Sequence, residues 1–229
     1  MIKPSLPVLL SVNGGYVDTA GFLALQGLFT SHVTGNFVTL GAALVLGTSG
    51  VLAKLMALPM FCIVVFATRV VTLTVTAGPW SALRLLLGLK VVLLITGAAL
   101  AIHLGPFHSG DGWQAILTGM TLVAAMAIQN AIHRIHMAST SPTTIMTGNT
   151  TQVMIDLADL LRPMTPEMSA TVHGRLRRMS ASVAAFAVGC AAAALIYALR
   201  GVWCFILPPL IALYSLTLQG SAPKPKEAK

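Results

Sequence analysis

The sequence has very little charge. Only 9% of its 229 residues are Asp, Glu, Lys or Arg, and the mean hydropathy is +0.85, whereas roughly 25% charged residues are usual in a soluble domain. Apolar runs follow one another along nearly the whole chain, and several approach the roughly 20 residues that cross a bilayer. These properties exclude a soluble globular domain and predict an all-α polytopic membrane protein.

Acidic residues are especially scarce, with six Asp and Glu against 14 Lys and Arg and a formal net charge of +8. Paired-carboxylate catalysis needs more acids than this, and the GxSxG, HExxH and P-loop patterns do not occur, so we expect no enzyme. The bases stand at the ends of apolar segments, as in loops that are retained in the cytoplasm. No polar domain carries them, so we expect no nucleic-acid partner.

Groups that bind metals or cofactors are also few. The three cysteines lie within apolar segments without a CxxC pair, which is typical of small core residues. Gln129, His133 and His136 share one helical face and could bind a metal, but no acid or cysteine completes the set nearby. An interfacial helix end is the preferred interpretation, and we expect neither a cofactor nor a metal.

What the sequence does contain is a repeated tripeptide, Thr34-Gly35-Asn36 and Thr147-Gly148-Asn149. Each copy follows an apolar stretch that carries one polar residue, Asp18 in the first half and Asn130 in the second. Each copy is then followed by a short apolar segment and a long one. The matching order predicts an internal duplication.

The duplication divides the chain into two membrane repeats, joined by a polar turn at residues 105–112. The repeats comprise residues 1–104 and 113–218, and residues 219–229 form a disordered basic tail. Residues 162–178 are strongly basic and contain two prolines, which predicts a loop. The Ala- and Gly-rich residues 182–199 predict a packing helix, because small side chains let membrane helices approach closely.

The two short segments leave two topologies open. At 1.5 Å per residue each reaches about 21 Å, less than the roughly 30 Å hydrocarbon core. If both are half-helices, six full spans remain and the halves form an inverted repeat; if both cross, there are eight spans and parallel halves. Asp156 and Asp159 favour six spans, because an unpaired carboxylate in the membrane costs several kcal/mol. Ser141-Pro142 favours eight, because a helix that began there would be long enough to cross. Six full spans with two short Thr-Gly-Asn half-helices is the preferred interpretation, and eight spans is the alternative.

The tripeptides are the candidate binding site. A helix that begins inside the membrane exposes unpaired N–H groups and the positive end of its dipole, and glycine allows a ligand to come close. Thr34, Gly35, Asn36, Thr147, Gly148 and Asn149 would then meet at one place and coordinate a small polar solute. In the alternative interpretation the glycines only permit close packing, and the asparagines hydrogen-bond between helices.

Asp18 and Asn130 complete this candidate site. Intramembrane carboxylates line a cavity, pair with a base or carry protons, and Arg69 is a candidate partner for Asp18. Asn130 occupies the related place as a neutral amide. The Gly14-Gly15 pair beside them costs helix stability, roughly 1 kcal/mol per glycine, so we expect a packing or functional reason for it.

Several of these motifs resemble the YoaK-type family of uncharacterised bacterial membrane proteins. The similar stretches are residues 15–25 (GYVDTAGFLAL), Phe29, residues 34–36 (TGN), 129–131 (QNA) and 146–149 (MTGN), and the similarity covers nearly the whole chain. The resemblance implies a bacterial inner-membrane location and a small-molecule permease role, without an established substrate. The Ser/Thr-rich sequence ahead of Thr144-Ile145 departs from the family and leaves the second helix start open.

The sequence therefore predicts a transporter or permease for a small polar solute, with both termini in the cytoplasm and the lipid bilayer as its surroundings. Small residues 184–194 would allow a homodimer. The alternative is a non-transporting membrane scaffold, sensor or lipid-binding protein that acts through the basic residues 162–178.

Overall fold

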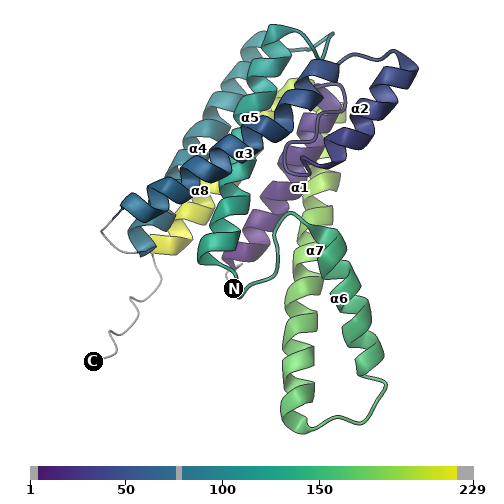
Figure 1. The fold of residues 1–229 in the computed structure, drawn as a ribbon, viewed down its shortest axis with the longest axis vertical. Helices are drawn as coiled ribbons and strands as arrows, with labels where there is room; N and C mark the ends of the chain where they lie inside the picture. The colour runs from purple at the N-terminus through teal and green to yellow at the C-terminus, as the bar shows by residue number, and fades with distance from the viewer. Residues whose placement is uncertain (1–4, 76–78, 221–229) are drawn as a thin grey trace.

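The computed structural model describes residues 5–75 and 79–220, and all regular structure in this part of the chain is helical. The predicted tail lies outside it from residue 221 onward. Figure 1 shows the arrangement of the helices. The helices are α1 (Leu6–Ala24), α2 (Gly35–Leu46), α3 (Val51–Thr74), α4 (Pro79–Leu104), α5 (Trp113–His136), α6 (Met146–Asp159), α7 (Pro166–Arg200), the 3-10 helix η1 (Gly201–Ile206) and α8 (Leu207–Gly220).

Four stretches of these helices are long and apolar enough to cross a membrane. They are Val51–Thr74, Ala82–Leu104, Trp113–His136 and Pro166–Leu218, the last of which contains α7, η1 and α8. Helix α2 is apolar but too short for such a span. The protein is all-helical and its apolar helices indicate that it is embedded in a membrane.

Helices α1 and α5 form the centre of the bundle. Helix α1 packs on α5, α7 and α8, and α5 packs on α3 and α4. In the most apolar window of α5, 78% of the residues are buried, against 22% in α3. This placement has a physical reason: α1 and α5 carry buried polar side chains such as Asn13, Asp18 and Gln129, and the outer helices separate these from lipid.

The two halves make the same helix pairings. When α1, α2 and α3 are matched with α5, α6 and α7, each contact in one half has a counterpart in the other. The pair α2–α3 matches α6–α7, and the pair α1–α7 matches α5–α3. Helix α4 packs on α5 as α8 packs on α1. The short helices α2 and α6 lie toward opposite ends of the molecule (Figure 1), which is the placement that an inverted repeat would produce.

The Gly14-Gly15 pair lies where α1 is crossed by other backbone, as the sequence led us to expect. A Cβ on Gly15 would lie 2.2 Å from the carbonyl oxygen of Phe186 in α7. A Cβ on Gly189, on the α7 side of the crossing, would lie 2.1 Å from the carbonyl oxygen of Val12. The two glycines therefore let α1 and α7 approach to backbone contact.

One boundary prediction is wrong, and one helix start on which the eight-span alternative depended does not occur. Residues 162–178 are not a loop, because α7 begins at Pro166 and continues to Arg200. Thr165 caps this helix by accepting a hydrogen bond from the Met168 N–H at 3.3 Å, and Pro166 takes the first helical turn, where its missing N–H costs nothing. Conversely, Ser141-Pro142 does not start a helix, because α6 begins at Met146.

The turn between the halves is fixed to the first half by Asp111. Its carboxylate accepts hydrogen bonds from the four backbone N–H groups of residues 50–53, at 2.7–3.4 Å, where α3 begins. Partial burial alone would raise the pKa of Asp111, but these hydrogen bonds hold it below its ordinary value. The carboxylate satisfies the unpaired N–H groups and the positive dipole of the helix start.

Candidate functional site

The carboxylate of Asp18 organises the loop between α1 and α2. Its Oδ1 accepts hydrogen bonds from the backbone N–H groups of Thr30 and Ser31 at 2.8 and 2.7 Å, and more weakly from that of His32. Its Oδ2 lies 2.6 Å from Nδ1 of His32. Asp18 is 4% exposed and pairs with His32, whereas Arg69, the partner considered from the sequence, lines a different pocket.

Asn36 holds the other side of the same loop. Its Oδ1 accepts from the Phe29 N–H and its Nδ2 donates to the Phe29 carbonyl, both at 2.9 Å. A Cβ on Gly35 would touch the ring of Phe29 at 3.1 Å, and Thr34 is exposed. The first Thr-Gly-Asn therefore fastens the start of α2 to the preceding loop.

The second Thr-Gly-Asn makes a related but weaker attachment. Asn149 donates from Nδ2 to the Pro142 carbonyl at 2.9 Å, whereas its Oδ1 is buried without a partner. Pro142 stands where the first half has Phe29, and proline has no N–H to offer that oxygen. Asn130, at the place of Asp18, accepts a hydrogen bond from the Thr144 hydroxyl at 2.7 Å.

This difference predicts that alanine substitution lowers the free energy of unfolding more at Asn36 than at Asn149. Asn36→Ala removes two hydrogen bonds and orphans both polar groups of Phe29, so we expect a loss of about 2–3 kcal/mol. Asn149→Ala removes one hydrogen bond to the Pro142 carbonyl, a weak one to the Met146 sulfur and also an unpaired buried oxygen, so we expect about 1 kcal/mol or less. Thermal unfolding of both variants in the same detergent measures the difference. Equal destabilisation would contradict the assigned contacts.

Two pockets flank the central helices at corresponding positions of the two halves. The first, of about 480 Å³, is lined by Asp18, Thr19, Phe22, Leu23, Phe29, His32, Gly35, Phe186 and Cys190. The second, of about 390 Å³, is lined by Phe61, Val65, Arg69, Asn130, Ala131, His133, Arg134, Ile135, Pro142, Thr144 and Ile145. The α5 residues of the second pocket have the same spacing as the α1 residues of the first: 130, 131, 134 and 135 against 18, 19, 22 and 23. The α3 pair Val65 and Arg69 likewise has the four-residue spacing of the α7 pair Phe186 and Cys190.

The predicted site residues are thus divided between two places. Asp18 and Gly35 line the first pocket, and Asn130 lines the second. On α6, Thr147 lines a shallow outer hollow, and a Cβ on Gly148 would meet open space. Helices α2 and α6, both fully described, do not contact each other. The structure does not bring the two tripeptides together, and their asparagines support the interpretation as helix braces.

A fully buried polar cluster that the site prediction omits lies among α1, α4 and α5. Lys90 of α4 donates from Nζ to Oε1 of Gln129 at 2.5 Å, and Gln129 donates from Nε2 to the Leu10 carbonyl at 2.9 Å. Gln129 also lies 3.2 Å from the Thr143 hydroxyl. In the sequence, a lysine within a long apolar run and the Gln129-Asn130 pair were the available signals.

Further polar groups near this level of α1 have no partner. The hydroxyl of Ser11 and both amide atoms of Asn13 are buried without a hydrogen bond, and both residues are 0% exposed. No group of three His, Cys, Asp or Glu side chains that could hold a metal ion occurs in residues 5–75 and 79–220. The buried polar groups of the described chain are therefore mainly amides and hydroxyls, together with the carboxylates of Asp18 and Asp156, the ammonium groups of Lys54 and Lys90, and the imidazole of His133.

Comparison with known proteins gives one match. A family model described as a protein of unknown function (DUF1275) matches residues 6–218. The chain belongs to the DUF1275 family. No curated protein and no solved structure gives a significant match.

In this member of the DUF1275 family, the contact between His32 and Asp18 predicts a pH dependence. The hydrogen bond to Asp18 raises the pKa of His32 above its ordinary value of 6.5, against the opposing effect of burial. The ion pair is therefore fully present below about pH 6.5 and is lost as pH rises through the raised pKa. We expect His32→Gln to lower the unfolding temperature more at about pH 5.5 than at about pH 9; a pH-independent difference would contradict this.

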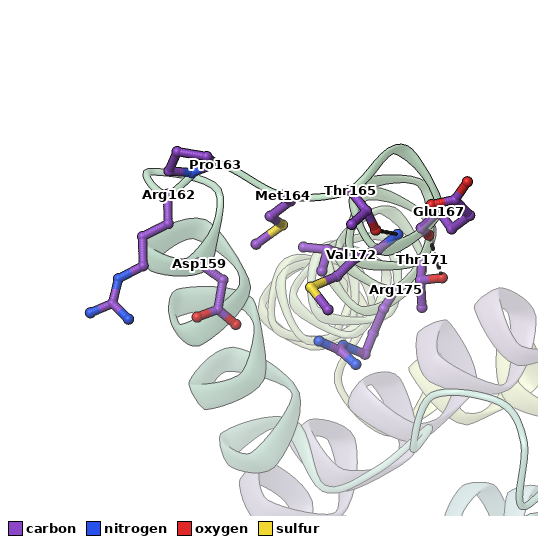
Figure 2. A pocket seen from close by; sticks show the side chains of 10 residues that line it. Asp159, Arg162, Pro163, Met164, Thr165, Glu167, Thr171, Val172 and Arg175 are labelled. Carbon is purple, nitrogen blue, oxygen red and sulfur yellow. Dashed lines mark hydrogen bonds between the residues drawn. The ribbon is translucent and has the colours of Figure 1, made fainter.

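Helix α6 and the first part of α7 form a hairpin that extends beyond the bundle (Figure 1). Arg175 fastens it through hydrogen bonds to the buried carboxylate of Asp156, the shortest being 2.6 Å. Figure 2 shows the hollow of about 690 Å³ near the hairpin tip, with Arg162 directed away from it. The basic stretch predicted as a loop is thus a rigid helical projection.

Proposed function

We propose that this chain is a transporter of a small polar solute and not an enzyme. The observation that carries the proposal is the fully buried Lys90–Gln129 cluster, together with the unpartnered polar groups of Ser11 and Asn13 in the same helix as Leu10, whose carbonyl Gln129 contacts. An ionisable group buried in a membrane protein is expensive to maintain, and such groups mark solute or ion pathways. A polar solute that paired these amides and the ammonium group would offset that cost.

The duplicated architecture supports the same proposal. The matched helix pairings, the two corresponding pockets and the short helices at opposite ends agree with an inverted repeat of six spans and two half-helices. Each pocket adjoins an irregular loop, and irregular backbone at membrane depth is tolerated where it is buried or lines a cavity. Membership of the DUF1275 family is compatible with the resemblance to YoaK-type inner-membrane proteins.

The distribution of bases supports cytoplasmic termini in a bacterial inner membrane. Figure 1 shows that α1 begins, α3 and α5 end and the hairpin projects toward one end of the bundle, and these segments contain most of the arginines in the described residues. The bases at this end are Arg69, Arg84, Arg134, Arg162, Arg175, Arg177 and Arg178. The opposite end carries Lys54 and Arg200. By the positive-inside rule the arginine-rich end faces the cytoplasm.

Transport is tested with Lys90→Met in reconstituted vesicles that are screened for solute uptake. Lys90→Met removes a buried ammonium group but leaves the Gln129 Oε1 without its donor, which costs about 1–3 kcal/mol. We therefore expect a less stable variant that still folds and has at least about tenfold lower flux per folded molecule. Lys54→Met is the matched control, because Lys54 is also buried but donates to the carbonyls of Gln26 and Ser49 near the start of α3.

We expect Lys54→Met to lower stability and to leave the flux per folded molecule unchanged. Wild-type flux in the Lys90→Met variant, for a solute that the wild-type protein demonstrably transports, would remove the proposed role of the cluster. Absence of any solute flux from the wild-type protein across a broad screen would count against transport itself.

The hairpin favours a second candidate, a membrane scaffold or sensor. Arg162, Arg177 and Arg178 are exposed on it, and a basic projection attracts anionic lipids or acidic partners. Cross-linking in cells from residue 162 tests this, and no captured partner would count against it. A homodimer would use the outer side of residues 184–194, because Ala185, Gly189 and Ala193 are buried and Gly189 contacts α1.

A further inference from the structure

The second pocket contains two arginines and no acid. Arg69 comes from the end of α3 and Arg134 from the end of α5, and both are exposed. The ion pairs within residues 5–75 and 79–220 are Asp18–His32 and Asp156–Arg175, so neither arginine is neutralised by a described carboxylate. Two guanidinium groups at one pocket create a positive potential that favours an anion.

A buried polar side chain in the pocket also lacks a partner. His133 is 9% exposed, lines the pocket and has no hydrogen-bond partner for its Nδ1. Leaving a buried polar atom unpaired costs about 1–3 kcal/mol. A bound group that supplies a donor or acceptor to this nitrogen would recover part of that cost.

Apart from Asn130 and Thr144, which hydrogen-bond to each other, the rest of the pocket is apolar. Its walls include Phe61, Val65, Ile135, Pro142 and Ile145, so a free inorganic ion would leave most of the cavity unfilled. The outer surface of α3 is apolar too, with Ile63 and Phe66 65% and 73% exposed. A ligand that matches the whole pocket carries an anionic group and a hydrocarbon part.

We propose that this pocket binds an anionic phospholipid at the arginine-rich end of the bundle. The phosphate lies between Arg69 and Arg134, because guanidinium groups match phosphate oxygens in a bidentate manner. The acyl chains follow the apolar walls and the exposed side of α3. Basic pockets between membrane helices on the cytoplasmic side are suited to lipid headgroups. The proposal does not depend on transport.

The first pocket provides an internal comparison. At the positions that correspond to Arg69 and Arg134 it has Cys190 and Phe22, and it carries the carboxylate of Asp18. Asp18 is paired with His32 in that pocket, so the pocket has no excess positive charge for an anionic headgroup, although the two pockets have similar size and apolar walls. The duplication thus offers the same cavity twice, and only the second copy has the charge that an anionic lipid requires.

The test measures lipid binding to the full-length protein purified in zwitterionic detergent. Phosphatidylglycerol, phosphatidylcholine and inorganic phosphate are added separately, and bound lipid is counted by native mass spectrometry alongside the unfolding temperature. The pocket variant is Arg69→Gln with Arg134→Gln. The matched control, Arg177→Gln with Arg178→Gln, removes the same charge from the hairpin.

We expect phosphatidylglycerol, but not phosphatidylcholine, to bind and stabilise the wild-type protein. The pocket variant should bind it at least about tenfold more weakly, while the hairpin control stays within about twofold of wild type. Equal weakening in both double variants would overturn the site in favour of general electrostatic attraction. Equal stabilisation by inorganic phosphate would overturn the lipid assignment. Each single arginine variant repeats the test if the double variant folds poorly.

Discussion

Gly15→Ala and Gly189→Ala are each expected to disrupt the folded bundle. The added methyl groups would lie 2.2 and 2.1 Å from the carbonyl oxygens of Phe186 and Val12, well inside van der Waals contact. Both obstacles are backbone atoms, so neither can be relieved by a change of rotamer, and α1 must move away from α7. We expect a loss of about 3 kcal/mol or more, at or beyond the upper end of overpacking costs. Unfolding temperature and the monodisperse fraction on size exclusion measure it.

Gly88→Ala in α4 is the matched control for these substitutions. A Cβ there meets no heavy atom within 4 Å, and alanine in place of a helical glycine gains up to about 1 kcal/mol in helix propensity. We expect Gly88→Ala to be neutral or stabilising. Wild-type stability for Gly15→Ala would show that the backbones do not approach as closely as described.

The second large effect is expected for Asp18→Ala. This substitution leaves three buried backbone N–H groups of residues 30–32 without their acceptor and removes the contact with His32. Unpaired buried groups cost about 1–3 kcal/mol each, in part offset by local rearrangement, so we expect a loss of about 4 kcal/mol. Thermal unfolding measures the total, and hydrogen exchange should show the change concentrated in residues 25–34.

Asp18→Asn distinguishes two roles of Asp18: holding the loop between α1 and α2 in place, and taking part in transport. The amide oxygen still accepts from the loop N–H groups, so we expect most of the stability to return. If Asp18 only braces the loop, flux per folded molecule remains near that of the wild type. A stable Asp18→Asn variant without flux would instead assign the negative charge a part in transport. Asp18→Ala with unchanged stability would contradict the bracing geometry.

The sequence predicted the helical membrane class well because that class depends on composition and length. Long apolar runs leave the backbone no alternative to helix formation in lipid, and α2 and α6 fall close to the predicted short segments. Both helix starts at which sequence and structure differ involve proline. Pro166 starts a helix because the Thr165 side chain caps it. Pro142 follows Ser141, which looks like a cap in the sequence, but no helix starts there. In the folded loop the Pro142 carbonyl instead accepts a hydrogen bond from Asn149.

The candidate site was predicted less well for a related reason. A duplicated motif shows that two positions are equivalent, but not whether they meet. In an inverted arrangement equivalent residues can lie toward opposite ends, and α2 and α6 do so (Figure 1). Asp18 and Gly35 line one pocket and Asn130 lines another. Lys90 was omitted because its hydrogen bond to Gln129 joins helices that are distant in sequence.

Pro142 makes the two loops unequal in their hydrogen bonding. Ahead of α2, the Asn36 side chain makes two hydrogen bonds to the backbone of Phe29. Ahead of α6, the Asn149 side chain makes one to the backbone of Pro142, and its Oδ1 has no donor. Local opening should therefore be more frequent on the α6 side. If the protein transports by alternating access, the conformation open on the α6 side would be more populated at rest than the one open on the α2 side. The α6 side would then open first.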